Sequence, residues 1–257
     1  VTGTPVRACF QGREASTCRA QLGLDPARPV LFVMGGSQGA SGINELVLQT
    51  LPLLGSRGSE WQWLHLTGPG DAQKVAAAYT ALKLKAIVHP FLAEMDVALG
   101  AATVAVCRAG ASSLAELAAM RVPAVLVPYP AATDNHQFHN ARAFEATGAA
   151  CLLEQKSATP EMLLQLLLDL VEKPAVQEKM RNALGQWHAP HAAEQIAEAM
   201  LSAVGAKASD NCRADRKSAA SLVSGAADTE SNPGVSGPTQ LSRTVLCNPA
   251  LPAGGGA

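Results

Sequence analysis

Short apolar runs rich in β-branched residues alternate along most of the chain with longer segments of helical periodicity. This alternation is typical of βαβ units, which build a parallel sheet covered by helices on both faces. We therefore predict a doubly wound, Rossmann-like α/β domain. The apolar runs place its strands at about residues 30–34, 61–66, 86–88, 103–107, 124–127 and 150–153.

Helices are predicted between and after these runs. The segment after the first strand carries apolar residues on one face, at Ile43, Leu46, Val47 and Leu51. Asp71 is expected to cap a helix that ends near Leu82, and the segment after the fourth strand is helical around Leu114, Leu117 and Ala118. Three more helices are predicted at about residues 160–172, 174–187 and 191–204.

The periodicity divides the chain into three parts. Residues 29–204 form the predicted domain, and residues 1–28 precede it. From about residue 205 to residue 257 the sequence is dominated by Ser, Ala, Gly, Pro and Asn. Such a composition buries too little apolar area to offset its ordering entropy, so a disordered low-complexity tail is expected. Because the sequence begins with Val1 rather than Met, we expect a fragment or an incomplete gene product.

Charge and composition exclude several functions. The chain has 257 residues, of which 48% are hydrophobic, and a formal net charge of −1. No bulk positive field is available to hold a nucleic acid or an anionic membrane, so any anion must be bound locally. The six cysteines form no CxxC pair, which argues against zinc or disulfides and favours a reducing cytosol. No apolar run approaches the roughly 20 residues that span a bilayer.

Two strand-to-helix turns carry the strongest chemical signal. Both turns, Gly35–Gly39 and Gly110–Ser113, are rich in glycine and small hydroxyl residues. At the carboxyl edge of a parallel sheet, such turns offer free backbone N–H groups and the positive end of a helix dipole to a phosphate. Two turns suit one diphosphate. The alternative is that each turn only makes a tight connection, since neither has a Walker A lysine or the GxGxxG fingerprint.

Other polar and apolar positions near these turns suit a nucleotide sugar. Glu116 follows the second turn by about one helical turn, where a carboxylate can accept both hydroxyls of a ribose. Phe91 and Leu92 could line a base, although such a pair is more often part of a core. Asp134–Gln137 could bind sugar hydroxyls, or could simply begin and cap a helix.

Six ordered blocks of the chain resemble the C-terminal half of the MurG-type glycosyltransferases. They are Gly35–Ala40, His65–Gly68, Cys107–Glu116, Pro123–Pro128, Asp134–Ala141 and Gly148–Ala150. Gly3–Arg7 also resembles the segment at the entry to that half, which implies that residues 1–28 are an inter-domain entry segment and that the N-terminal acceptor domain is missing. The resemblance covers roughly residues 1–204 and implies the donor domain of a GT-B enzyme. The family transfers N-acetylglucosamine from UDP-N-acetylglucosamine to undecaprenyl-pyrophosphoryl-N-acetylmuramoyl-pentapeptide, converting lipid I to lipid II in peptidoglycan synthesis.

The resemblance also implies which residues bind the substrate. Ser37 and the Ala111–Ser113 turn would contact the diphosphate, with Arg7 near the same site. Phe91 and Leu92 would line the uracil, Glu116 would bind the ribose and Gln137 the sugar. The full substrate-binding set is Arg7, Ser37, Gln38, Phe91, Leu92, Ala111, Ser112, Ser113, Glu116, His136 and Gln137. The chain departs from the family pattern at Thr4, Ala109, Ser112 and His136.

The resemblance sets further expectations for the reaction. The displacement at the sugar C1 is inverting, and the general base and the lipid-linked acceptor site belong to the N-terminal domain. This chain alone should bind the donor without transferring the sugar. No cofactor is implied. The sequence places no pair of carboxylates near the two turns, so no metal is expected. The whole enzyme would lie in the cytoplasm, peripheral on the inner face of the cell membrane through the missing domain.

Other functions remain open at this point. The chain could be a binding subunit of a split glycosyltransferase, in which a separate chain supplies the acceptor domain. A Rossmann-type oxidoreductase is disfavoured by the absent dinucleotide fingerprint, whereas a UDP-sugar epimerase shares the fold, which does not fix function.

Overall fold

The computed structural model describes residues 2–36 and 38–204, and within them six strands form one parallel sheet. The strands are β1 (Val30–Met34), β2 (Gln62–Leu66), β3 (Ala86–His89), β4 (Val104–Cys107), β5 (Ala124–Leu126) and β6 (Cys151–Leu152). Their order is β3-β2-β1-β4-β5-β6. All residues of β1, β2, β4 and β5 are buried, as expected for parallel strands covered on both faces. The predicted doubly wound α/β fold is confirmed.

Helices connect the strands and follow the last one. They are α1 (Ala15–Gln21), α2 (Ser41–Thr50), α3 (Ala72–Ala81), α4 (Met95–Ala101), α5 (Ala111–Met120), α6 (His136–Ala146), α7 (Pro160–Glu172) and α8 (Pro174–Trp187). Short 3-10 segments span Leu51–Ser59 (η1) and Thr133–Asn135 (η2), and a last helix covers residues 192–204. Among the residues described, none of these helices has the length and apolar character needed to span a bilayer.

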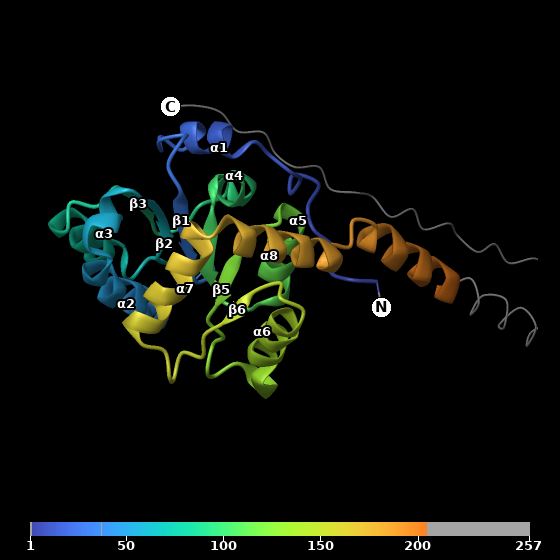
Figure 1. Ribbon diagram of the computed structural model, residues 1–257. Helices are drawn as coiled ribbons and strands as arrows, with labels where there is room; N and C mark the ends of the chain where they lie inside the picture. The colour runs from blue at the N-terminus through green and yellow to red at the C-terminus, as the bar shows by residue number, and fades with distance from the viewer. Residues whose placement is uncertain (1, 37, 205–257) are drawn as a thin grey trace, which may run out of the picture. The chain divides into compact units, whose positions relative to one another are not determined.

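The helices pack in two groups (Figure 1). In one group α3 and α7 pack against α2, and in the other α1 and α5 pack against α4 while α8 covers α5. Right-handed crossovers put the helices that follow β1 and β2 on one face of the sheet and those that follow β4 on the other. The chain therefore reverses its direction of winding at β1 and β4, which are neighbours in the sheet.

Most predicted elements occur within a residue or two of their expected bounds. The apolar faces also agree: Ile43, Val47 and Leu51 are buried, as are Leu114 and Leu117. The helices α1 and α4 were not predicted. Both helices have only seven residues. α1 buries a single residue, Cys18, and Gly100 interrupts the apolar residues of α4, so neither segment shows a clear helical repeat of apolar positions. The predicted tail from residue 205 to residue 257 lies outside the described residues.

The prediction that Asp71 caps a helix is confirmed in position but not in side-chain contact. Asp71 occupies the N-cap position of α3, but its side chain makes no capping hydrogen bond. Its Oδ2 instead accepts a hydrogen bond of 2.8 Å from Nδ2 of Asn44 on α2. The carboxylate thus joins two helices rather than the first turn of one, a tertiary contact that local sequence does not reveal.

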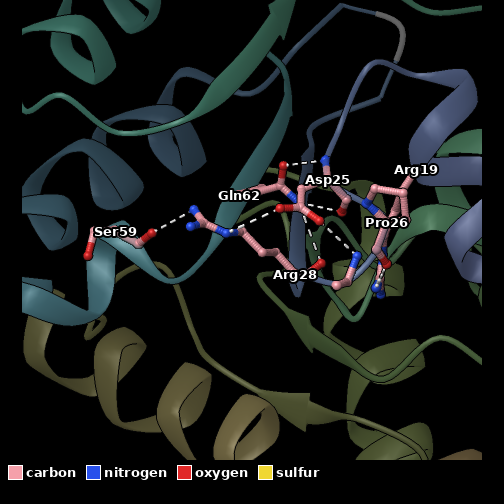
Figure 2. Close-up of polar contacts among 7 residues, drawn as sticks. Arg19, Asp25, Pro26, Arg28, Ser59 and Gln62 are labelled. Carbon is pink, nitrogen blue, oxygen red and sulfur yellow. Dashed lines mark hydrogen bonds and ion pairs between the residues drawn. The ribbon is translucent and has the colours of Figure 1, made fainter.

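Side chains of Arg19, Arg28 and Gln62 form hydrogen bonds near the amino ends of β1, β2 and β4 (Figure 2). We call these three residues the amino-edge clamp. Gln62, fully buried at the start of β2, accepts from the Asp25 N–H at 2.7 Å and donates to the Asp25 carbonyl at 2.9 Å. Arg19 donates to the carbonyls of Ala101 and Pro26, each at 3.0 Å. Arg28 donates to the Ser59 carbonyl at 2.9 Å. The loop before β1 is thereby fixed to the sheet.

Candidate functional site

The carboxyl ends of β1 and β4 meet where the strand order reverses. The register pairs Met34 with Cys107, so the turns that follow these two strands start side by side. Open α/β sheets bind ligands in the crevice at such a switch point, because the two following connections diverge to opposite faces. The two glycine-containing turns found in the sequence are these connections.

A pocket of about 390 Å³ opens at this switch point. That volume lies within the roughly 300–1,000 Å³ typical of small-molecule sites. Six residues of the predicted substrate-binding set line it together: Arg7, Phe91, Leu92, Ser112, Ser113 and Glu116. They come from the N-terminal segment, the connection after β3 and the start of α5. Met34, Gly36, Leu66, Pro90, Ala93 and Met95 complete the lining.

Glu116 and Arg7 supply opposite charges to this pocket. Glu116 is half-buried. Burial raises the pKa of its carboxyl, and the positive charge of Arg7 offsets only part of this rise. The Arg7 guanidinium lies 5.0 Å from the ring centroid of Phe10, a buried residue that the sequence reasoning did not single out. Such a cation–π contact restricts where the guanidinium can lie. The pocket thus combines a partly desolvated carboxylate with a positioned cation.

The start of α5 offers hydrogen-bond donors. Its N-cap is Gly110, which has no side chain to satisfy the first N–H groups. In the first turn of a helix these groups lack helical partners and carry the positive end of the dipole. Ser112 is exposed and Ser113 is half-buried, and both line the pocket. An anion at this helix end would meet backbone and hydroxyl donors together.

The turn after β1 is held by close backbone contact. Gly39 has a φ of 78°, and a Cβ added to it would lie 2.1 Å from the carbonyl oxygen of Thr67. Only glycine allows this turn to pack against the Thr67–Gly68 turn that follows β2. Gln38 is exposed and does not line the pocket, and Ser37 lies outside the described residues.

A buried polar chain supports this packing from behind. The amide nitrogen of Asn44 donates to the Thr67 carbonyl at 3.0 Å and to Asp71 at 2.8 Å, so its Oδ1 must be an acceptor. His65 Nε2 lies 3.0 Å from that Oδ1 and therefore carries the proton. His65 Nδ1 then accepts from the Tyr79 hydroxyl at 3.1 Å. Burial lowers the pKa of His65 to about 3, so the ring is neutral.

The remaining predicted residues lie outside the pocket. The prediction that the segment Asp134–Gln137 begins a helix is confirmed, since α6 starts at His136 with Asn135 at its N-cap; Asp134 and Asn135 themselves have left-handed φ values of 50° and 54°. Gln137 Oε1 accepts from the Tyr129 N–H at 3.0 Å, and His136 Nδ1 lies 2.8 Å from the Thr133 carbonyl. Their contact with a sugar stays a prediction.

A second pocket, of about 250 Å³, lies on the opposite face of α5 and includes Ala111. Val6 lines it, whereas Arg7 lines the first pocket, because successive side chains of an extended segment point to opposite sides. Asn140 also lines it and donates to the Ala109 carbonyl at 3.1 Å, which fixes the turn before α5. The sequence reasoning missed Asn140, although it follows His136 by one helical turn.

The second pocket is closed at one side by an aromatic pair. Trp187 stacks on Phe144 with ring centroids 4.2 Å apart, and its indole N–H donates to the Thr147 hydroxyl at 2.8 Å. The pair joins the end of α8 to α6.

Comparisons with known proteins agree with this geometry. Residues 30–199 match the model of the glycosyltransferase family 28 C-terminal domain. A UDP-N-acetylglucosamine–N-acetylmuramyl-(pentapeptide) pyrophosphoryl-undecaprenol N-acetylglucosamine transferase of Anaeromyxobacter dehalogenans is 39% identical over 176 residues, 68% of this chain and 46% of that protein. The enzyme of the same name from Xanthomonas axonopodis pv. citri is 40% identical, over 79% of this chain and 47% of that protein.

Among solved structures, MurG of Acinetobacter baumannii superimposes with a TM-score of 0.65 at 28% identity, covering 77% of this chain and 57% of that one. The chain spans about half the length of the curated relatives it matches. The switch-point pocket, the parallel sheet and these matches agree, and the chain belongs to glycosyltransferase family 28, whose C-terminal domain it contains.

Proposed function

We propose that this chain is the donor-binding half of an inverting glycosyltransferase that moves N-acetylglucosamine from UDP-N-acetylglucosamine to undecaprenyl-pyrophosphoryl-N-acetylmuramoyl-pentapeptide. The observation that carries the proposal is the pocket at the β1–β4 switch point, which gathers an acid, a cation, an apolar wall and a helix start. The relatives named above support the choice of donor and acceptor.

The proposed pose follows from the chemistry of the lining. The uracil would lie against Phe91 and Leu92, of which Phe91 is 63% exposed and so has an uncovered ring to offer. The ribose hydroxyls would donate to the carboxylate of Glu116. The diphosphate would then reach the start of α5, where Ala111, Ser112 and Ser113 begin the helix.

The sugar would extend from the diphosphate towards α6. In this pose His136 and Gln137 contact its hydroxyls. Since the Gln137 carbonyl oxygen already accepts from Tyr129, its amide N–H groups are the part that could donate. Ser37 and Gln38 complete the proposed donor set from the first turn.

The proposed reaction breaks the bond between the sugar C1 and the diphosphate as an acceptor hydroxyl forms a new bond at the opposite face of C1. Negative charge grows on the departing UDP. The helix dipole of α5, the donors of its first turn and Arg7 would stabilise that charge without a cofactor or a metal. The general base and the acceptor site would belong to the other half of the enzyme, so we expect this chain alone to bind the donor without transferring the sugar.

We also propose that the whole enzyme works in the cytoplasm on the inner face of the cell membrane, where its lipid-linked acceptor lies. The contact with the membrane would be made by the acceptor-binding half.

Calorimetry with a Glu116→Ala variant tests the proposed pose. If Glu116 accepts hydrogen bonds from the ribose, the variant should bind UDP roughly tenfold more weakly or worse, the usual cost of losing hydrogen bonds to a charged group. Thermal stability should barely change. Glu178→Ala is the matched control, because Glu178 is an exposed helical glutamate far along the chain, on α8.

A second ligand isolates the ribose contact. UDP lacking the 2′-hydroxyl should bind the wild-type chain more weakly than UDP, yet should lose much less on the Glu116→Ala variant than UDP does, because the hydroxyl and its acceptor form one interaction. Equal affinity of the wild-type chain and Glu116→Ala for UDP would refute the ribose assignment.

A further inference from the structure

A pocket lined by three arginines lies at the opposite edge of the sheet from the donor site. This arginine pocket has a volume of about 220 Å³ and includes Arg13, Arg121 and Arg181. Its lining also includes Gly100, Ala102, Val122 and Pro123. These residues precede β4 and β5, so the pocket lies at the amino ends of those strands. None of its lining residues in the described chain is Asp or Glu.

Two residue choices place the guanidinium of Arg121 at this pocket. Arg121 ends α5 with a φ of 52°, a left-handed conformation for which glycine is the favoured residue. Gly185 lies inside α8, where glycine is disfavoured. A Cβ added to Gly185 would lie 3.3 Å from Nη2 of Arg121. The chain thus has an arginine where glycine fits better, and a glycine where the arginine needs room.

Capping of the nearby helix ends does not account for these arginines. The carbonyls of Leu117 and Ala118, in the last turn of α5, accept from the N–H groups of Val122 and Arg121. At the end of α4, the Ala101 carbonyl accepts from Nε of Arg19 in the amino-edge clamp. These three carbonyls already have partners, and neither the Arg121 nor the Arg181 guanidinium donates to a helix-end carbonyl within residues 2–36 and 38–204.

The three guanidiniums are only partly neutralised. Arg13 pairs with Asp96 at 2.6 Å. Within residues 2–36 and 38–204, the guanidiniums of Arg121 and Arg181 form neither an ion pair nor a hydrogen bond. Two uncompensated cations therefore border one small cavity.

We propose that the arginine pocket binds a phosphate group, as free phosphate, as part of a small phosphorylated molecule or as a lipid headgroup. Guanidinium groups match the oxygens of phosphate through paired N–H donors. The cavity is smaller than the roughly 300 Å³ at which sites for drug-sized ligands begin, which suits one phosphate rather than a whole nucleotide. This site is separate from the donor pocket and does not depend on the proposed function.

Titration of the 257-residue chain with inorganic phosphate, followed by backbone amide NMR, tests the proposal. We expect saturating shifts at the amides of Gly100, Val122 and Gly185. Arg121→Gly should weaken this binding about tenfold or more, since one charge-assisted contact is lost. The variant should fold, because glycine suits the left-handed position. The matched control is Arg142→Gln, which removes one exposed charge from α6 and should leave the shifts unchanged.

Vesicles identify the source of the phosphate. Co-sedimentation would compare vesicles of phosphatidylcholine with vesicles that also contain phosphatidylglycerol. Weaker binding of Arg121→Gly than of Arg142→Gln to the anionic vesicles supports the proposal with a lipid headgroup as the source. Saturating phosphate shifts that are weakened in Arg121→Gly, together with equal vesicle binding, support it with a soluble phosphate as the source. Phosphate shifts that do not saturate, or that are the same in Arg121→Gly and the wild-type chain, together with equal vesicle binding, overturn it.

Discussion

The amino ends of β1 and β2 and the carboxyl ends of β1 and β4 use polar residues in different ways. At the amino ends of β1 and β2, the side chains of Gln62 and Arg19 form hydrogen bonds with backbone groups of the same chain. At the carboxyl edge, Ser112 and Ser113 face a pocket, and Glu116 keeps a carboxylate there despite partial burial. Polar groups that satisfy one another hold a fold together, whereas polar groups held apart are available to a ligand. A change at each edge should therefore affect a different property.

The largest effect is expected at the amino edge. Gln62→Ala removes three hydrogen bonds of a fully buried side chain and leaves backbone groups of Asp25 and Arg28 without them. The free energy of unfolding should fall by about 2–4 kcal/mol, measured by urea denaturation. The affinity of the folded chain for UDP should stay the same. Ser113→Ala provides the contrast: stability should change by less than about 0.5 kcal/mol. A loss of UDP affinity in folded Gln62→Ala would break the comparison.

The polar chain behind the first turn gives a pH dependence of stability. Burial lowers the pKa of His65 to about 3, so below pH 6.5 a proton binds the unfolded chain more readily than the folded one. The contribution of His65 is complete above that pH and decreases as the pH falls. From pH 7.5 to 5.5 we expect a loss of about 1.4 kcal/mol in the free energy of unfolding. His65→Gln, which cannot titrate, should show a pH dependence that is smaller by about this amount. An undiminished pH dependence in that variant would contradict the burial of a neutral ring.

A smaller effect, on the pH dependence of ligand affinity, is expected at the carboxyl ends of β1 and β4. Burial raises the pKa of Glu116, and the ionised carboxylate is the form that accepts hydrogen bonds from ribose. Uridine affinity should therefore fall on acidification, beginning at a higher pH than the roughly 4.3 of an ordinary glutamate would give. Uridine is the right ligand because it has no phosphate to titrate. Glu116→Gln should bind uridine more weakly and without this pH dependence. A wild-type profile that is flat down to pH 4.5 would argue against Glu116 as the acceptor.

The smallest effect is expected from metal removal. The lining of the donor pocket contains one carboxylate, that of Glu116, and helix-end donors with Arg7 would neutralise the diphosphate. EDTA should change the UDP dissociation constant by less than about twofold in calorimetry, within the scatter of a few tenths of a kcal/mol. Loss of UDP binding in EDTA, restored by magnesium, would show that the carboxyl edge needs an ion that these side chains do not replace.

The strands and the main helices could be predicted because buried parallel strands appear as continuous apolar runs, and because faces such as Ile43–Val47 repeat at helical spacing. The grouping of Arg7 with Phe91 and Glu116 followed from family resemblance rather than from any local pattern. The structure brings these residues together across more than 100 positions of sequence.

Other contacts depend on tertiary structure alone. Asn44 reaches Asp71 and His65 only after α2 and α3 pack side by side, so neither pairing has a signal in the sequence. The left-handed Arg121 is likewise hidden, because local sequence predicts glycine for such a position and gives no reason to expect a pocket. Sequence reasoning therefore named six residues that line the switch-point pocket, and it gave no indication of the arginine pocket.

The aromatic pair of Trp187 and Phe144 has a practical consequence for optical measurements. All three tryptophans of the chain lie in the described part; Trp61 and Trp63 are 2% and 0% exposed, whereas Trp187 is 38% exposed. Water-soluble quenchers would therefore reach one indole and leave the emission of the other two unchanged. Since Trp187 shares its pocket with Ala111, the first residue of α5, that single indole is a built-in fluorophore beside the helix end proposed to receive the diphosphate.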